Sequence, residues 1–162
     1  MPGIILEGGT FRPIFSAGVM DALLDEDIMF PYMIGVSAGI CDGMLNRGKA
    51  VPGGTCGFWG ACGAGISAGM FVSILSGATP LTEESWGLSN QMTSKALEAI
   101  SRTGGPRCCK RDSYLAILAA VDFVKTHFGI EMECTEVQCT HYAQNNQCIG
   151  KRCPFWRFDD SI

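Results

Sequence analysis

Cysteine thiols are the most numerous groups in this chain that could do chemistry. Nine cysteines occur in 162 residues. Cys41 stands alone, and we expect it to be a small buried residue. The other eight form four groups: Cys56 and Cys62, Cys108 and Cys109, Cys134 and Cys139, and Cys148 and Cys153. Because short loops can bring grouped thiols to one centre, these eight cysteines are candidate ligands of a metal ion or cluster.

The spacing of the thiols bears on the kind of centre. No pair has the C-x2-C spacing of a zinc ribbon, whereas the C-x4-C spacings and the final Cys153-Pro154 favour an iron–sulfur cluster over zinc. Eight thiols could form two four-sulfur sites, or one such site and a redox pair. His141 is a further candidate ligand, and His127 is expected to interact with a helix C-terminus. Disulfides and unliganded thiols are the alternatives.

A serine in a glycine-rich turn is the second candidate for chemistry. The motif G-V-S-A-G at residues 35–39, with Ser37 at its centre, lies where an expected strand passes directly into a helix. Such a turn exposes the hydroxyl and points a helix N-terminus at a developing oxyanion. The backbone amides of Gly8, Gly9 and Thr10 could supply an oxyanion hole. A second G-x-S-A-G, at 65–69, lies inside a helical pattern, where we expect close helix packing instead.

Residues 3 to about 46 resemble the start of the bacterial patatin-like phospholipases. The matching stretches are L-E-G-G-T-F-R, F-S-A-G-V-M-D and I-G-V-S-A-G. The resemblance implies a lipid acyl hydrolase in which Ser37 attacks a lipid ester and Gly8, Gly9 and Thr10 line the oxyanion hole. The dyad aspartate of that family lies in a far downstream Asp-Gly motif, whereas the only Asp-Gly here is Asp42-Gly43. Because a serine without a base is a poor nucleophile, we expect a structural remnant rather than a working hydrolase.

The elements expected before residue 47 form an α/β fragment. Hydrophobic patterning predicts strands at 3–7 and 32–36 and helices at 14–26 and 38–46. This strand–helix–strand–helix order implies a parallel pair with a right-handed crossover. Because two strands cannot bury both faces of a sheet, we expect this small sheet to pack on the helical part, on a second copy of the chain or on a partner chain.

The chain after residue 47 is expected to be mostly α and cysteine-rich. Helices are predicted over 61–76, from Thr82 to Arg102 and from Asp112 to Gly129, with Thr82 and Asp112 as N-caps. Glycines mark the predicted helix ends. The tail from Cys134 is polar and lacks periodicity. The predicted domains are therefore 1–46 and 47–162, in a chain that is α-dominated overall.

The larger part, residues 48 to about 155, resembles an uncharacterised Cys-rich domain of anaerobic bacteria and archaea. The stretches that match are C-G-F-W-G-A-C-G-A, G-A-T-P-L, G-G-P-R-C-C-K-R and the ending with Cys148 and Cys153. This resemblance implies a domain boundary and no established activity. Together, the two resemblances describe the front of one family joined to the back of another.

Composition excludes several classes of protein. With 12 basic and 16 acidic residues and a net charge of −4, the chain lacks the basic excess of a nucleic-acid binder. The N-terminus has no secretory leader pattern, so we expect a cytoplasmic protein with reduced thiols. The uncharged stretch from 50 to 82 contains too many glycine and polar residues for a transmembrane helix.

The leading interpretation is a thiol-rich protein that binds a metal ion or an iron–sulfur cluster, with a redox or accessory role. The alternatives are a patatin-like serine hydrolase of lipid acyl esters using Ser37, and a structural fusion without activity.

Overall fold

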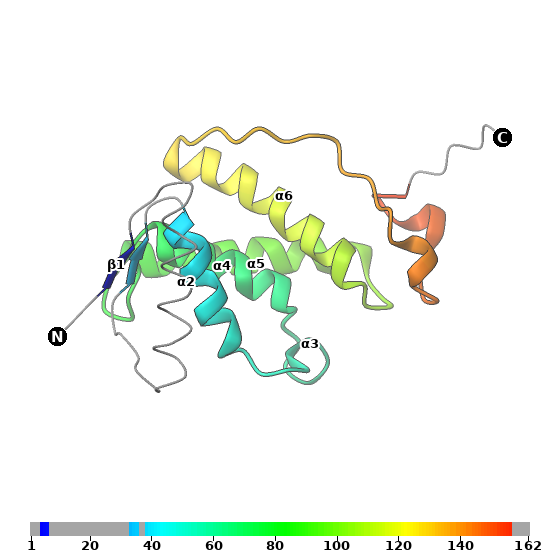
Figure 1. The fold of residues 1–162 in the computed structure, drawn as a ribbon, viewed down its shortest axis with the longest axis horizontal. Coiled ribbons are helices and arrows are strands. Elements are labelled where there is room, and N and C mark those ends of the chain that lie inside the picture. Colours follow the sequence, from blue (N-terminus) through cyan, green and yellow to red (C-terminus); the bar gives the residue numbers. More distant parts are fainter. Residues whose placement is uncertain (1–3, 7–32, 36–37, 157–162) are drawn as a thin grey trace.

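The structure is a computed structural model that describes residues 4–6, 33–35 and 38–156, and most of these residues are helical (Figure 1). The elements are β1 (Ile4–Leu6), β2 (Met33–Gly35), α2 (Ala38–Lys49), α3 (Thr55–Phe58), α4 (Gly63–Leu75), α5 (Glu84–Thr103), α6 (Cys109–Phe128) and the 3-10 turns η1 (Tyr142–Gln144) and η2 (Gly150–Arg152). The prediction of an α-dominated fold is confirmed for the residues that the structure describes.

The two short strands lie beside α2. β1 and β2 pair in parallel, with Ile4 opposite Met33 and Leu6 opposite Gly35. α2 contacts both β2 and α4, so it connects the strand pair to the helical part. The helix expected over 14–26 lies outside the described residues. The complete N-terminal α/β unit, and what covers its sheet, therefore stay predictions.

Helices α4, α5 and α6 pack against one another and enclose the core. Met92, Phe123 and Val72 have almost no exposed surface, and full burial of such a side chain contributes about 1.5–3 kcal/mol. Several core positions are alanines, which lets the helix axes approach. The buried cluster consists of Ala68, Val72, Met92, Ala96, Ala116, Ala120 and Phe123.

Two glycines of α4 set its distance from α5. A Cβ atom on Gly69 would overlap the Thr93 hydroxyl and lie 3.0 Å from the carbonyl oxygen of Ser89. A Cβ on Gly65 would lie 2.6 Å from Cδ2 of Leu97. The second G-x-S-A-G motif is thus a helix-packing motif, which confirms its interpretation from the sequence.

The predicted helix ends are confirmed and the predicted N-caps are wrong. α5 and α6 end at glycines with positive φ, Gly104 at 70° and Gly129 at 66°. Thr82 precedes α5 and instead closes a turn, where its hydroxyl accepts from the Thr79 N–H and donates to the Thr79 carbonyl. α6 begins at Cys109, so Asp112 lies in its first turn, where its side chain is buried.

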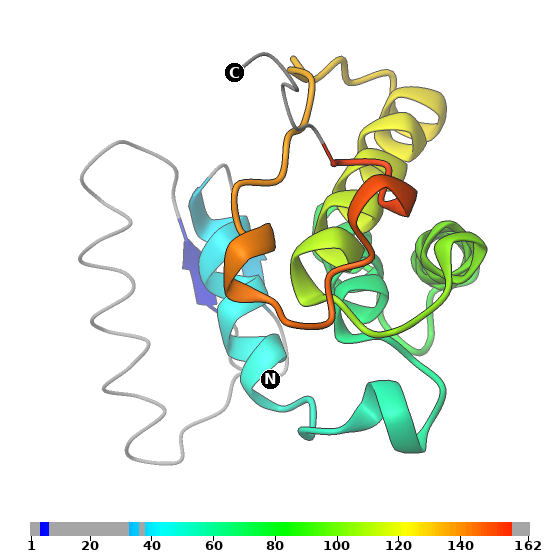
Figure 2. The same cartoon turned by 90° about the vertical axis from the view of Figure 1, so that its right-hand side faces the viewer.

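The segment after α6 folds back along that helix. In both views residues 130–156 return toward the N-terminal end of α6, where η1 and η2 lie (Figures 1 and 2). The Phe155 ring is buried and packs edge-on against Tyr114 of α6, with ring centroids 5.2 Å apart. The Cys139 N–H donates to the Phe155 carbonyl at 2.9 Å. These contacts dock an irregular tail on the first turns of α6.

None of the described helices combines the length and the apolar character that a membrane crossing requires.

Candidate thiol site

A pocket of about 220 Å³ lies where the tail meets the start of α6. Two of its cysteines, Cys108 and Cys109, come from the start of α6, and three, Cys139, Cys148 and Cys153, come from the tail. The fold therefore brings together thiols from two distant parts of the chain. Aromatic side chains, including those of Tyr114 and Phe155, complete much of the lining.

Side-chain exposure separates these cysteines into two kinds. Cys108, Cys139, Cys148 and Cys153 are half-buried in the pocket, whereas Cys109 is exposed. Cys134, which the sequence pattern groups with Cys139, is also exposed and does not line the pocket. Its thiol faces the neighbouring Thr135 carbonyl at 3.8 Å. The half-buried set in the pocket thus includes Cys108 and leaves out Cys134, although Cys134 is the nearer to Cys139 in sequence.

Short turns present the tail thiols to the pocket. The Cys148 N–H donates to the Asn145 carbonyl, and the Cys153 N–H donates to the Gly150 carbonyl at 2.8 Å. The Gly150 N–H points at the Cys148 sulfur, with nitrogen and sulfur 3.5 Å apart. A backbone N–H directed at a sulfur stabilises negative charge on it, as in the surroundings of metal-bound thiolates.

The pocket thiols line one space without closing to coordination distance. In the part of the chain that the structure describes, no three Cys, His, Asp or Glu side chains form a group able to hold a metal ion as they stand. All eight cysteines from Cys56 to Cys153 are free thiols. Three of the pocket thiols belong to a tail whose regular structure is limited to η1 and η2.

The two histidines lie in different surroundings. His141 lines the pocket at the start of η1. His127 lies in the last turn of α6, away from the pocket, and its ring stacks on Phe123 with centroids 4.1 Å apart. His141 therefore stays a candidate ligand, and His127 does not join this site.

A second group of thiols lines a cleft of about 940 Å³ beside α5. Cys56 lies in α3, and Cys62 immediately precedes α4. The Arg107 Nη1 donates to the Cys56 sulfur at 3.5 Å, and this hydrogen bond is the main reason why the pKa of Cys56 is lowered from its usual value. The same contact raises the pKa of Arg107.

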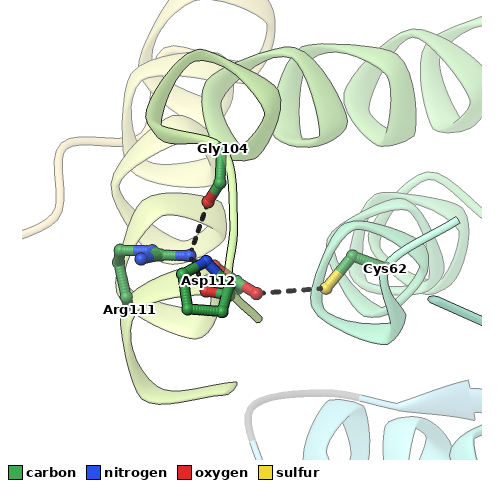
Figure 3. Close-up of polar contacts among 5 residues, drawn as sticks. Cys62, Gly104, Arg111 and Asp112 are labelled. Atoms are coloured by element: carbon green, nitrogen blue, oxygen red, sulfur yellow. Dashed lines mark hydrogen bonds and ion pairs between the residues drawn. The ribbon is translucent and has the colours of Figure 1, made fainter. Parts of the chain in front are cut away.

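A buried ion pair between Arg111 and Asp112 contributes to the wall of this cleft. Figure 3 shows the polar contacts of these two residues. The Arg111 Nε and the Asp112 Oδ1 are 3.3 Å apart, and each residue is 3% exposed. The other Asp112 oxygen faces the Cys62 sulfur at 3.9 Å. Arg111 also donates through Nη2 to the carbonyls of Gly104 and Pro106, at 2.7 and 2.9 Å. The pair therefore connects the loop before α6 to the start of α4.

The sequence interpretation did not place Arg107 beside Cys56, Asp112 beside Cys62, or Cys108 beside the tail thiols. The basic run around Cys108 and Cys109 indicated only that cationic side chains lie near thiols, where they favour thiolates. The contact of Asp112 with Cys62 depends on how α6 packs against α4, which local sequence does not show.

The predicted serine site lies outside the described residues. This applies to Ser37 and to Gly8, Gly9 and Thr10, and the side chain of Cys41 is likewise not described. The hydrolase interpretation of the N-terminus therefore stays a prediction.

The fold and the thiol clusters define a small, predominantly helical, cysteine-rich protein. The model of DUF5714, a family of unknown function, matches residues 36–156, and the chain belongs to this family. The match confirms an uncharacterised domain over the Cys-rich part and gives no support to a patatin-like N-terminus. It begins inside the motif at 35–39, ahead of the boundary expected near residue 47. No curated protein and no solved structure matches the chain.

Proposed function

We propose that this protein binds a metal centre through the thiolates of Cys108, Cys139, Cys148 and Cys153, with an iron–sulfur cluster as the favoured centre and zinc as the alternative. The single observation that carries the proposal is the convergence of these four half-buried thiols on one pocket. Four sulfurs are the ligand set both of a structural zinc ion and of a [4Fe–4S] cluster.

The surroundings of the pocket suit a centre with excess negative charge. Four thiolates exceed the positive charge of zinc or of a doubly charged cluster by two, and the cationic Lys110 lines the same pocket. The charge of Arg111, which also lines the pocket, is paired with Asp112. The N–H of Gly150 is directed at the Cys148 sulfur, and hydrogen bonds of this kind tune cluster potentials. Tyr114, Phe155 and Trp156 supply apolar surface that limits access of water.

The centre would also fix the tail in place. Cys108 belongs to the helical part, whereas the other three ligands belong to the irregular tail. One centre bound to all four would therefore join η1 and η2 to α6. As an iron–sulfur cluster it would carry one electron, and as zinc it would be structural, which are the redox and accessory roles expected from the sequence.

The proposal is tested by metal and acid-labile sulfide analysis of anaerobically purified protein, together with its visible spectrum. We expect about one centre per chain, with sulfide and charge-transfer absorption for a cluster, or zinc without either. The Cys148→Ser and Cys153→Ser variants should lose most of the metal. Cys109→Ser is the matched control, because this thiol is exposed at the rim of the same pocket, and it should keep the metal. Less than about 0.2 equivalents of metal in the wild-type protein would overturn the proposal.

A further inference from the structure

We propose that Cys56 and Cys62 form a redox-active dithiol that reduces small-molecule disulfides, with Cys56 as the attacking thiolate and Cys62 as the resolving thiol. This site uses none of the four cysteines assigned to the metal centre. It goes beyond that function, because it performs thiol–disulfide exchange whether or not a metal is bound.

Cys56 has the surroundings of an attacking thiol. It is half-buried at the edge of the cleft of about 940 Å³, where a small molecule can reach it. The Arg107 guanidinium donates to its sulfur at 3.5 Å. A cationic donor stabilises the thiolate over the thiol, and the thiolate is the nucleophile in disulfide exchange. The lowered pKa of Cys56 agrees with this geometry.

Cys62 has the opposite surroundings. Its sulfur faces the Asp112 carboxylate at 3.9 Å, and that carboxylate is fixed by its ion pair with Arg111 (Figure 3). The carboxylate is a hydrogen-bond acceptor, so it accepts from the Cys62 thiol. The two thiols therefore have unlike partners, a cationic donor at Cys56 and a carboxylate at Cys62.

The backbone between the two thiols allows them to meet. Both line the same cleft and also a second cavity of about 330 Å³. Residues 57–60 are exposed, and this segment includes Gly57 and Gly60, the latter with a φ of 68°. α3 is a single turn, so closing the pair requires movement of one short exposed segment and not of the helical core.

The exchange balances in two steps. The Cys56 thiolate attacks one sulfur of the disulfide, the S–S bond breaks, and the first product leaves as a thiolate. The Cys62 sulfur then attacks the Cys56 sulfur of the mixed disulfide, forming the Cys56–Cys62 bond and releasing the second product. The proton of Cys62 ends on a released thiolate. Two protein thiols are oxidised to one disulfide, and the small disulfide is reduced to two thiols.

The test uses the full-length reduced protein and bis(2-hydroxyethyl) disulfide, with acid quenching and mass spectrometry. Trypsin would release Cys56 and Cys62 together, since residues 50–95 contain no internal lysine or arginine. In the wild-type protein we expect this peptide to lose two hydrogens and carry no adduct. In Cys62→Ser, Cys56 should carry a hydroxyethyl-thiol adduct, because no resolving thiol remains. In Cys56→Ser the peptide should stay unmodified on the same time scale.

Cys134 provides the internal control, because it is an exposed thiol outside both pockets. Cys56 should react at least about threefold faster than Cys134 in the same sample. Equal rates at the two thiols, or a Cys62→Ser variant that captures no adduct, would overturn the proposal. An adduct that persists on wild-type Cys56 would also overturn it, since Cys62 would then not resolve. Metal content is measured on the same samples and should not change in Cys56→Ser or Cys62→Ser. A failure of the dithiol proposal can therefore be distinguished from a failure of the metal-centre proposal.

Discussion

The helical core and the thiol-bearing segments of this protein are organised in opposite ways. The core joins three helices through buried alanines, two close-approach glycines and large apolar side chains such as Phe123. The thiols lie at helix starts, in the single turn of α3 and in the irregular tail. The helical core therefore supplies most of the stability, and the thiol-bearing segments carry the candidate chemistry. Substitutions should change either the free energy of unfolding or the thiol chemistry, except where one residue connects the core to a thiol-bearing segment.

Arg111 is such a connecting residue, and its replacement should give the largest loss of stability. Arg111→Met leaves the buried Asp112 carboxylate without its partner and two carbonyls without their donor. Removing one member of a buried pair costs about 3–5 kcal/mol, so we expect a loss of that size in urea denaturation. Arg102→Met is the control, because its pair with Glu98 is exposed, and it should change the free energy of unfolding by less than about 0.5 kcal/mol. Similar losses in both variants would contradict the account of the ion pair.

Gly69→Ala tests the core alone. The added Cβ would overlap the Thr93 hydroxyl and approach the Ser89 carbonyl, so α4 and α5 must separate. Overpacking of this kind should lower the free energy of unfolding by about 1–3 kcal/mol. At Gly87 of α5 an added Cβ meets nothing within 4 Å, so Gly87→Ala should stabilise the protein by about 0.5–1 kcal/mol. The metal content per folded chain should stay at the wild-type value in both.

Phe155→Ala tests the tail alone. Its buried ring packs on Tyr114, and its backbone carbonyl accepts from Cys139. Loss of the ring should loosen the tail and reduce metal affinity about tenfold, measured by competition with a chelator. The free energy of unfolding of the helices should fall by only about 1 kcal/mol. A loss of stability larger than that of Gly69→Ala would show that the tail and the core form one unit.

Arg107→Gln should leave stability unchanged, because Arg107 is exposed, and should alter only thiol reactivity. The guanidinium lowers the pKa of Cys56 by stabilising its thiolate. Without the guanidinium, the pKa of the Cys56 thiol rises. The pH at which the alkylation rate of Cys56 increases is therefore higher in the variant than in the wild-type protein. At neutral pH, Cys56 in the variant should therefore react several-fold more slowly with iodoacetamide. An unchanged pH profile would contradict the assignment of Arg107.

Sequence patterns predicted the core well because its signals are local. Glycines at 104 and 129 mark helix ends in the sequence as in the structure, and the spacing of Gly65 and Gly69 indicates close packing wherever the partner helix lies. The N-cap prediction for Thr82 failed because its hydroxyl closes a local turn with Thr79, whereas that for Asp112 failed for a non-local reason. Asp112 is a good cap by residue type, but its carboxylate is buried against Arg111 and faces Cys62 across the α4–α6 contact.

The sequence predicted that cysteines would form the candidate site, but not which cysteines would meet in one pocket. Cys134 and Cys139 are close in sequence, yet only Cys139 lines the pocket. The position of the tail depends on Phe155 meeting Tyr114 and on the hydrogen bond from Cys139. Neither contact leaves a periodic pattern, so the partnership of Cys108 with the tail thiols required the three-dimensional structure.

The most direct test of the metal centre compares Cys108→Ser with Cys134→Ser. Both are single sulfur-to-oxygen changes, and sequence grouping favours Cys134 as a ligand, whereas the pocket contains Cys108. Metal is quantified per chain after anaerobic purification and gel filtration of each variant. We predict that Cys108→Ser loses most of the bound metal and that Cys134→Ser retains the wild-type amount. Retention by Cys108→Ser with loss by Cys134→Ser would contradict the account.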